Sequence, residues 1–332
     1  MISTLDDSSK LWFERLFTRV GLPFWAGVLL VGFFPPLILT LLGYYTYGVR
    51  TDFTGGVSLG VPLLLANVIY ISFSSRYIRR RVEELEQYAL SMGVDRSRIR
   101  TSYLSDFRLI LATWVVLLAT GVVVLEPFFN PAYSLVQNLL RELLYSYMRL
   151  LQATFLWIFL SSMVAIYEMG QLPLRLKIFT EDRTLGLKPF ANTSLHLTTI
   201  YVIAIILTFP IFLYPNFAVE LSLTIFLVPG LFFFLVPLFG LHKKMSEVRA
   251  EKSAAIGLRH SRVMSEVEAV GEGPLGEGLV NELLAIDAIK REIHQMHDWP
   301  FDIGTVARLT GILGAPLVAT VLAAYLIRLF GV

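Results

Sequence analysis

The sequence contains one long polar segment, HKKMSEVRAEKSAAIGLRHSRVMSEVEAVGEGPLGEGLVNELLAIDAIKREIHQM, at residues 242–296. It is charged and polar, although long apolar blocks lie on both sides of it. Its second half repeats apolar residues at intervals of three and four, which predicts a helix with one apolar seam. The members of this seam are Leu279, Leu283, Ile286, Ile289, Ile293 and Met296.

The first half of the same stretch predicts an outgoing helix. Its apolar positions are Met245, Val248, Ile256, Val263 and Val267. Four glycines and a proline in 271–278 predict a loop between the two helices. We therefore expect an antiparallel helical hairpin over 242–303 that projects about 40 Å, at roughly 1.5 Å per residue. Such a hairpin is marginally stable alone, so we expect partner helices, either from other subunits or from a cytoplasmic protein.

The composition around this hairpin is that of a membrane protein. The chain has 332 residues, of which 55% are hydrophobic and 16% charged, whereas soluble domains hold about 25% charged residues. Its mean hydropathy is +0.64. Seven apolar blocks are long enough to cross about 30 Å of hydrocarbon. These blocks lie at roughly 24–47, 56–75, 108–126, 147–169, 196–214, 219–241 and 304–330.

The positions of lysine and arginine predict the orientation of the chain. Alternate loops place 24 of these residues on one face and 4 on the other. Because basic residues concentrate on the cytoplasmic side, the sequence predicts an all-α polytopic protein of the cell membrane. It has seven transmembrane helices, a cytoplasmic N-terminus and an external C-terminus.

Four units follow from this topology. Residues 1–23 form a cytoplasmic interfacial helix with Trp12 and Phe13 towards lipid, or else a frayed terminus. Residues 24–241 hold six spans, with a cytoplasmic helical extension at 76–107. The hairpin covers 242–303, and 304–332 form the seventh transmembrane helix.

A basic cluster lies where the second span enters the cytoplasm. Its members are Arg76, Arg79, Arg80 and Arg81. Such a cluster binds anionic lipid headgroups at roughly 1 kcal/mol per charge, or serves only as an anchor of the topology. Both interpretations remain open from the sequence.

Catalytic motifs are missing from the sequence. It contains no P-loop, no GxSxG and no HExxH, and the absence of cysteine excludes disulfides and thiolate chemistry. His294, His297 and Asp298 are close in sequence, but a third strong metal ligand is not adjacent. Ionisable residues that mark coupled transport are missing from the centres of the spans. We expect no enzyme activity, no catalytic residue, no cofactor, no metal and no nucleic-acid partner.

The last span carries a stripe of small residues. Gly311, Ala315, Ala319 and Ala323 recur at intervals of four. Small residues allow helices to approach closely, so this stripe predicts either tight helix packing or the apolar lining of a central pore, gated by dewetting.

A corner joins the hairpin to this last span. We expect Asp298 to be an N-cap and Pro300 to occupy the first helical turn. Asp302 favours the positive end of the helix, and Trp299 suits the aromatic belt of the interface. The corner is therefore a candidate hinge between the hairpin and the stripe.

Seven spans in this orientation, with cytoplasmic helices directly before the last span, resemble the insect odorant and gustatory receptor-like channel superfamily. The resemblance implies a homo-oligomer in which 242–298 form the anchor and Gly311 to Ala323 lie near the ion path. The C-terminal Thr-Tyr … Gln-Phe signature of the superfamily differs here. The segment AAYLIRLF, residues 323–330, keeps Tyr325 and Phe330 but has Ala324 and Arg328. The segments LGLKP (185–189) and WPFD (299–302) also resemble uncharacterised prokaryotic multi-span proteins.

Two functions fit this sequence. The first is an oligomeric ion channel with the seventh helix near a central pore and a cytoplasmic anchor. The alternative is a non-conducting membrane receptor or scaffold that docks a cytoplasmic partner through the 242–303 hairpin.

Overall fold

The computed structural model describes residues 10–30, 32–34, 37, 53–99, 101–124, 134–177, 182, 184–208, 232–270, 276–296, 298–300, 304, 307–311 and 314. Within these residues the chain is helical and has no strand, so the predicted all-α class is confirmed. The longer helices are α1 (Trp12–Val20), α3 (Phe53–Ser91), α4 (Phe107–Val124), α5 (Leu135–Gln171), α6 (Lys188–Thr208), α8 (Phe239–Val270) and α9 (Glu277–His294). Three short 3-10 helices are η2 (Arg96–Arg98), η3 (Ser102–Ser105) and η4 (Val236–Leu238).

Two described helical stretches are long and apolar enough to cross a membrane, namely Asn138–Gln171 and Lys188–Thr208. A third span exists if Trp12–Val20 and Phe24–Phe34, which meet at an angle of 105°, count as one broken span. The described residues therefore hold two to three candidate spans. Most of the predicted sixth span and nearly all of the seventh lie outside the described residues.

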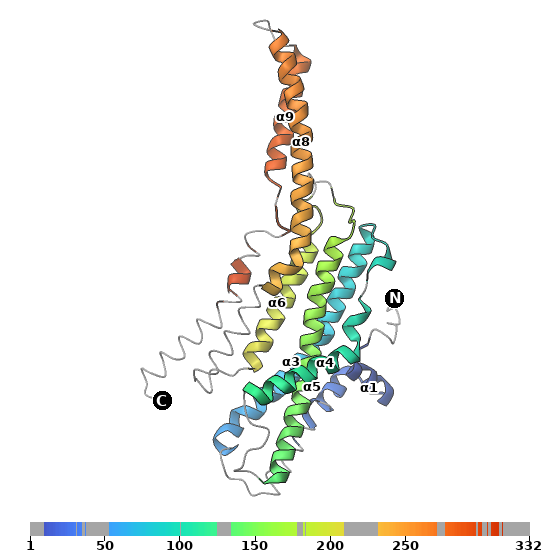
Figure 1. The fold of residues 1–332 in the computed structure, drawn as a ribbon, viewed down its shortest axis with the longest axis vertical. Coiled ribbons are helices and arrows are strands. Elements are labelled where there is room, and N and C mark those ends of the chain that lie inside the picture. Colours follow the sequence, from blue (N-terminus) through green and yellow to red (C-terminus); the bar gives the residue numbers. More distant parts are fainter. Residues whose placement is uncertain are drawn as a thin grey trace, which may run out of the picture.

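Helices α3, α5 and α6 form the central bundle (Figure 1). An aromatic cluster is buried between α5 and α6. The ring of Phe159 stacks on Tyr201 at 4.6 Å between centroids and meets the edge of Phe233 at 5.4 Å. Phe159 is fully buried. Each such ring pair adds about 0.5–1.5 kcal/mol beyond its buried area, so this cluster fixes α5 against α6.

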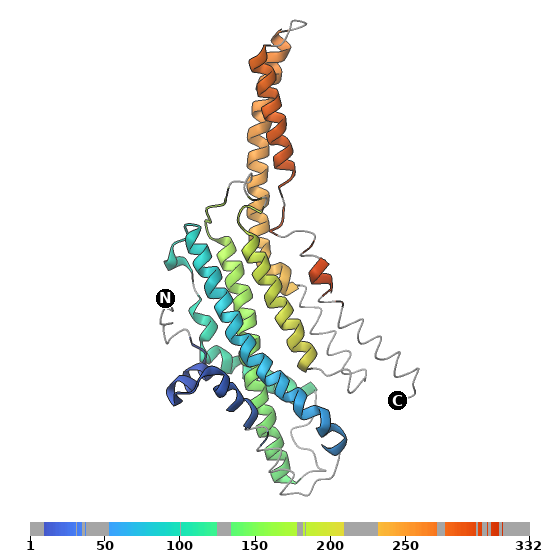
Figure 2. The same cartoon turned by 180° about the vertical axis from the view of Figure 1, so that it is seen from behind.

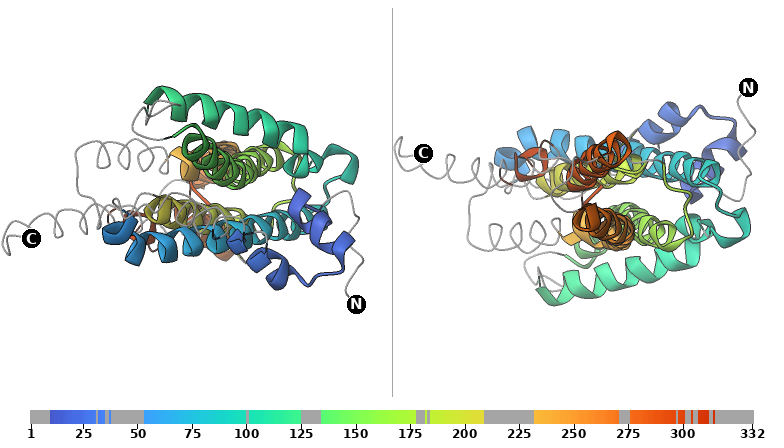
Figure 3. Two further views of the ribbon diagram at one scale, coloured as in Figure 1. Left: turned by 90° about the horizontal axis from the view of Figure 1, so that it is seen from below. Right: turned by 90° about the horizontal axis from the view of Figure 1, so that it is seen from above.

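Helix α4 lies across α5 rather than along it (Figures 1 and 3). It covers most of the predicted span 108–126. The indole Nε1 of Trp114 donates to the backbone oxygen of Ser146 at 2.8 Å, which fixes the crossing. The Nε1 of Trp157 likewise donates to the backbone oxygen of Tyr103 at 3.0 Å, just before α4 begins. These two indoles attach α4, and the segment just before it, to α5.

Helix α1 corrects one sequence-based expectation. Phe13 is buried in the core instead of facing lipid, Phe17 is buried beside it, and Trp12 donates its Nε1 hydrogen to Thr154 Oγ1 at 3.0 Å. The close approach requires Gly27, because a Cβ there would lie 2.3 Å from the Phe17 ring. The aromatic face of α1 packs inward because the bundle offers it both apolar surface and a hydroxyl partner. Exposed apolar residues remain on the opposite face.

Helices α8 and α9 lie antiparallel and project beyond the bundle (Figures 1 and 2). Helix α8 has 32 residues, which corresponds to about 48 Å. Its side chain Val263 is buried against α9, where Ile286 and Ile293 are buried too. An ion pair between Arg259 Nη2 and Glu282 Oε1 at 2.8 Å links the two helices beside this seam.

Candidate functional site: the base of the hairpin

Three parts of the chain meet where the hairpin leaves the bundle. They are the C-terminal end of α5, the first turns of α8, and residues 298–300, which return from α9. We call the joint between them the hairpin base. It is formed by His242, Lys244, Arg249, Asp298 and Trp299.

Trp299 packs against the first turns of α8. Its ring stacks on His242 at 4.2 Å between centroids and 12° between planes. Its edge meets Phe239 at 5.6 Å and 62°. The sequence predicted a membrane-interface role for this indole, and the structure places it in an aromatic sandwich with α8.

Asp298 holds the returning chain on α8 in two ways. Its carboxylate Oδ1 accepts a hydrogen bond from Arg249 Nη1 at 2.6 Å. Its backbone oxygen lies 2.6 Å from His242 Nδ1, and because a carbonyl oxygen only accepts, that ring nitrogen carries the proton. Arg249 Nη2 also donates to the backbone oxygen of His294 at 3.4 Å. The sequence predicted that this carboxylate caps the next helix, whereas the structure shows it in an ion pair with Arg249 of α8.

Lys244 joins the hairpin base to α5. Its Nζ donates to the backbone oxygen of Gly170 at 3.3 Å and also to that of Leu172. These carbonyls end α5, where the helix leaves its last acceptors unpaired and carries partial negative charge. Burial lowers the pKa of Lys244, and the nearby Glu247 partly opposes that shift. The ammonium therefore acts as a cationic cap on α5.

Two glycines let α5 and α8 approach closely enough for this cap. A Cβ on Gly240 would lie 2.5 Å from Gln171 Nε2, and one on Gly170 would lie 3.2 Å from Leu241 Cγ. A side chain at position 240 would displace the amide of Gln171, and one at position 170 would require Leu241 to shift by a few tenths of an ångström. The hairpin base is therefore a packed joint, in which displacement of the hairpin acts directly on the end of α5.

A second polar cluster joins α1 to α3, and sequence analysis did not find it. Glu14 is buried, accepts from the Leu11 backbone N–H at 3.0 Å, and pairs with Arg79 Nη2 at 3.1 Å. Arg76 Nε lies 3.2 Å from the same carboxylate. Arg79 also pairs with Glu83 at 2.7 Å.

This cluster corrects the lipid-headgroup prediction for Arg79. Only 3% of that residue is exposed, and its guanidinium is bound by the two carboxylates. Arg76 lies over the ring of Phe24 at 4.2 Å; burial, with Arg80 nearby, lowers the pKa of Arg76 against the opposing effect of Glu14. Arg81 pairs with Glu84 at 2.9 Å, and Arg80 is exposed. Arg80 and Arg81 keep their predicted place at the surface.

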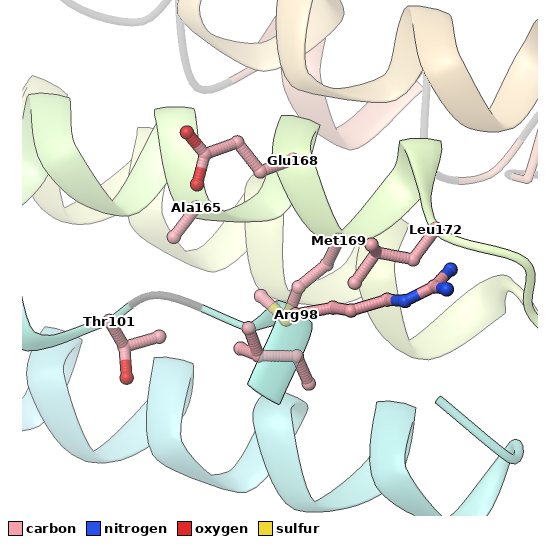
Figure 4. A pocket seen from close by; sticks show the side chains of 7 residues that line it. Arg98, Thr101, Ala165, Glu168, Met169 and Leu172 are labelled. Atoms are coloured by element: carbon pink, nitrogen blue, oxygen red, sulfur yellow. The ribbon is translucent and has the colours of Figure 1, made fainter. Parts of the chain in front are cut away.

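A small cavity lies between α5 and the connector that holds η2 and η3 (Figure 4). Glu168 enters it from α5, while Arg98 and Thr101 enter from the connector. Glu168 accepts a hydrogen bond from the Tyr103 hydroxyl at 3.3 Å, and burial together with this carboxylate raises the pKa of Tyr103. These bonds attach the connector to α5, and we assign the cavity a structural role.

Most of the predicted stripe and part of the predicted corner lie outside the residues that the structure describes. Ala315, Ala319, Ala323, Asp302 and His297 are not among the described residues. Gly311 is described, and within the described part of the chain a Cβ there would meet no atom within 4 Å.

Pro300 is buried directly beside the hairpin base.

The Nδ1 of His294 lies 2.8 Å from the backbone oxygen of Lys290. This ring is therefore engaged with its own helix, on the exposed side of α9.

Comparisons of the chain with protein-family models, with curated proteins and with solved structures give no match. The resemblance to the odorant and gustatory receptor-like channels is untested by these comparisons and stays a hypothesis.

Proposed function

We propose that this protein is a receptor or scaffold of the cell membrane that docks a cytoplasmic partner through the α8–α9 hairpin. In this proposal the N-terminus is cytoplasmic, and the hairpin projects into the same compartment. The observation that carries the proposal is the hairpin base. Lys244 of α8 caps the last carbonyls of α5, so a force on the hairpin reaches a candidate membrane span directly.

The hairpin has the properties of a docking arm. Val263 of α8 and Ile286 of α9 are buried where the two helices pack together, so the hairpin covers part of its own apolar seam. Most of its other side chains are exposed. Because its root is held by stacked rings, an ion pair and a partly buried ammonium, the arm presents its surface in a defined direction.

Removing the arm while keeping its base tests this function. Residues 250–292 are replaced by a four-residue Gly-Ser turn, which fits because Arg249 and His294 are within hydrogen-bond distance. Such a turn is flexible and adds no structure of its own. We expect the variant to insert and purify normally but to lose partner recovery in a cross-linking pull-down. Unchanged recovery of the same partner would contradict the docking role.

One observation favours the oligomeric ion channel as a second candidate. Gly311 begins the stripe of small residues, and among the described residues a Cβ there would meet no atom within 4 Å. The chain has no native cysteine, and a single cysteine at 311, 315, 319 or 323 would therefore be its sole thiol.

Ion flux into proteoliposomes tests the channel. If the stripe lines a pore, a charged thiol reagent should block flux in at least one of the four cysteine variants. A cysteine at the exposed Ser265, far from the stripe in sequence, is the matched control. An absence of flux in the unmodified protein would exclude conduction under those conditions and leave the docking function.

A further inference from the structure

The two halves of the hairpin carry opposite charge. Between residues 263 and 289 there are six acidic residues and no lysine or arginine. They are Glu266, Glu268, Glu272, Glu277, Glu282 and Asp287. The remainder of 242–298 holds eight lysine or arginine residues and four acidic ones. We call residues 263–289 the distal half.

Two of these acidic side chains pair with basic residues nearer the base. Glu282 binds Arg259, and Asp287 binds Arg291 at 2.5 Å. Glu266, Glu268 and Glu277 are exposed. Those three residues therefore make the described surface of the distal half negative.

Apolar side chains are exposed among these charges. Leu284 is 62% exposed and Val280 is 39% exposed. Because they are four residues apart, they share one face of α9. Met264 of α8 is also exposed at 37%. Exposed apolar surface rimmed by charge is typical of an interaction site.

The sign of the charge argues against a second copy as the occupant. Copies of one protein in one membrane share the same orientation, so their distal halves stand at the same height. Acidic surfaces of equal sign would then face each other and repel. Anionic lipid headgroups would be repelled for the same reason.

We propose that the distal half of the hairpin binds a basic amphipathic helix of a partner protein. The apolar face of that helix covers Val280 and Leu284, and its lysine and arginine residues lie against Glu268 and Glu277. Laying an amphipathic helix on exposed apolar residues is a common mode of peptide recognition. This inference rests on the docking function proposed above and specifies the chemistry of the partner.

Binding of a designed peptide to the full-length protein tests the inference. The protein is placed in nanodiscs of zwitterionic phosphatidylcholine, and empty nanodiscs serve as the blank. The probe is a labelled helical peptide of leucine and lysine with an apolar stripe, and the control peptide carries glutamate in place of lysine. We expect fluorescence anisotropy to show binding of the lysine peptide alone. Its affinity should fall at least about tenfold as salt is raised from low to high concentration, because exposed charges are screened within about 10 Å.

Two sets of variants locate the site. Val280→Ser with Leu284→Ser should weaken binding about tenfold, and Glu268→Gln with Glu277→Gln should do the same. The matched control is Glu247→Gln with Glu251→Gln, which removes acidic residues near the base and should leave binding unchanged. Equal binding of both peptides, or full binding by the distal variants, would overturn the inference.

The outcome separates this inference from the docking function. If the 250–292 replacement abolishes partner recovery while the distal variants keep it, docking stands and the basic-helix inference fails. If the replacement leaves recovery intact, both fail. Salt-sensitive self-association of the hairpin through the distal half would also overturn the choice of partner.

Discussion

The two polar joints found among the described residues differ in their access to water. The α1–α3 joint is buried, with Arg79 between Glu14 and Glu83. The hairpin base is more open, and its ion pair between Arg249 and Asp298 joins partly exposed side chains. A buried charge that loses its partner is costly, whereas an exposed pair is worth about 0–1 kcal/mol. The comparison indicates that the α1–α3 joint depends most on its charges, whereas the hairpin base is held by stacked rings and helix packing as well as by its ion pair.

The largest expected effect comes from breaking the buried joint. Arg79→Met removes one of the two cations beside the buried Glu14 and leaves Arg76 as its remaining partner. The loss of stability should therefore stay below the roughly 3–5 kcal/mol of a fully unpaired buried charge, but be the largest in this set. The measurement is the thermal unfolding midpoint in detergent. Arg80→Met, at an exposed site in the same helix, should change stability by less than about 0.5 kcal/mol. Equal shifts for the two variants would contradict the buried joint.

The next effect concerns the aromatic part of the hairpin base. Trp299→Ala removes the ring that stacks on His242 and meets Phe239. Replacing a fully buried large aromatic residue by alanine costs about 3–5 kcal/mol. Because Trp299 is only half-buried, we expect a smaller, local loss. Amide hydrogen exchange should accelerate in 293–300 and stay unchanged in α3. Trp25→Ala, at an exposed indole, should leave both regions unchanged.

A smaller effect is expected at the cationic cap of α5. Lys244→Met keeps much of the side-chain length but removes the charge and the donors, which costs up to about 2 kcal/mol for a partly buried cap. Amide exchange should then accelerate in the last turn of α5. Lys243→Met, at an exposed neighbour, is the control. Equal protection of that turn in both variants would show that the ammonium does not cap the helix.

The smallest effect is a pH dependence in the loop between α5 and α6. Burial alone would raise the pKa of Asp182, but hydrogen bonds from Thr184 and Gly186 outweigh it and lower that pKa. The ionised carboxylate therefore stabilises the turn at any pH above the ordinary aspartate pKa of about 3.9. This stabilisation is lost as the pH falls through the lowered pKa of Asp182 in the folded protein. Protection of the Gly186 amide, corrected for intrinsic rates, should fall below about pH 4. Asp182→Asn should show no such transition.

The helices were predictable because their patterns are local. The seam spacing in 279–296 and the glycines of 271–278 indicated two helices and the break between them, and α8 ends at Val270 while α9 begins at Glu277. The predicted number of spans is a different matter, because the described residues hold two to three candidates. Helix α4 lies across α5, and its described apolar part, Phe107–Ala119, is shorter than a full span.

The candidate site was only half predictable. Asp298, Trp299 and Pro300 were found from the corner sequence, since proline beside aromatic and acidic residues marks a helix boundary. Lys244 and His242 were not, because their partners lie 72 and 56 residues away. Glu14 was missed for the same reason. Its only local signal was an acidic residue in the first turn of an amphipathic helix.

The distance between the arm and α5 is the most direct measure of whether the hairpin base holds the arm on the bundle. Val164→Cys on α5 and Ser265→Cys on α8 are both at exposed positions, and the chain has no other cysteine. Spin labels at these sites should give one narrow distance distribution in nanodiscs. Adding Lys244→Met and Trp299→Ala should broaden it clearly. A distribution that is already broad in the parent, or one that stays narrow in the variant, would contradict the hairpin base as the joint that couples the arm to the membrane helices.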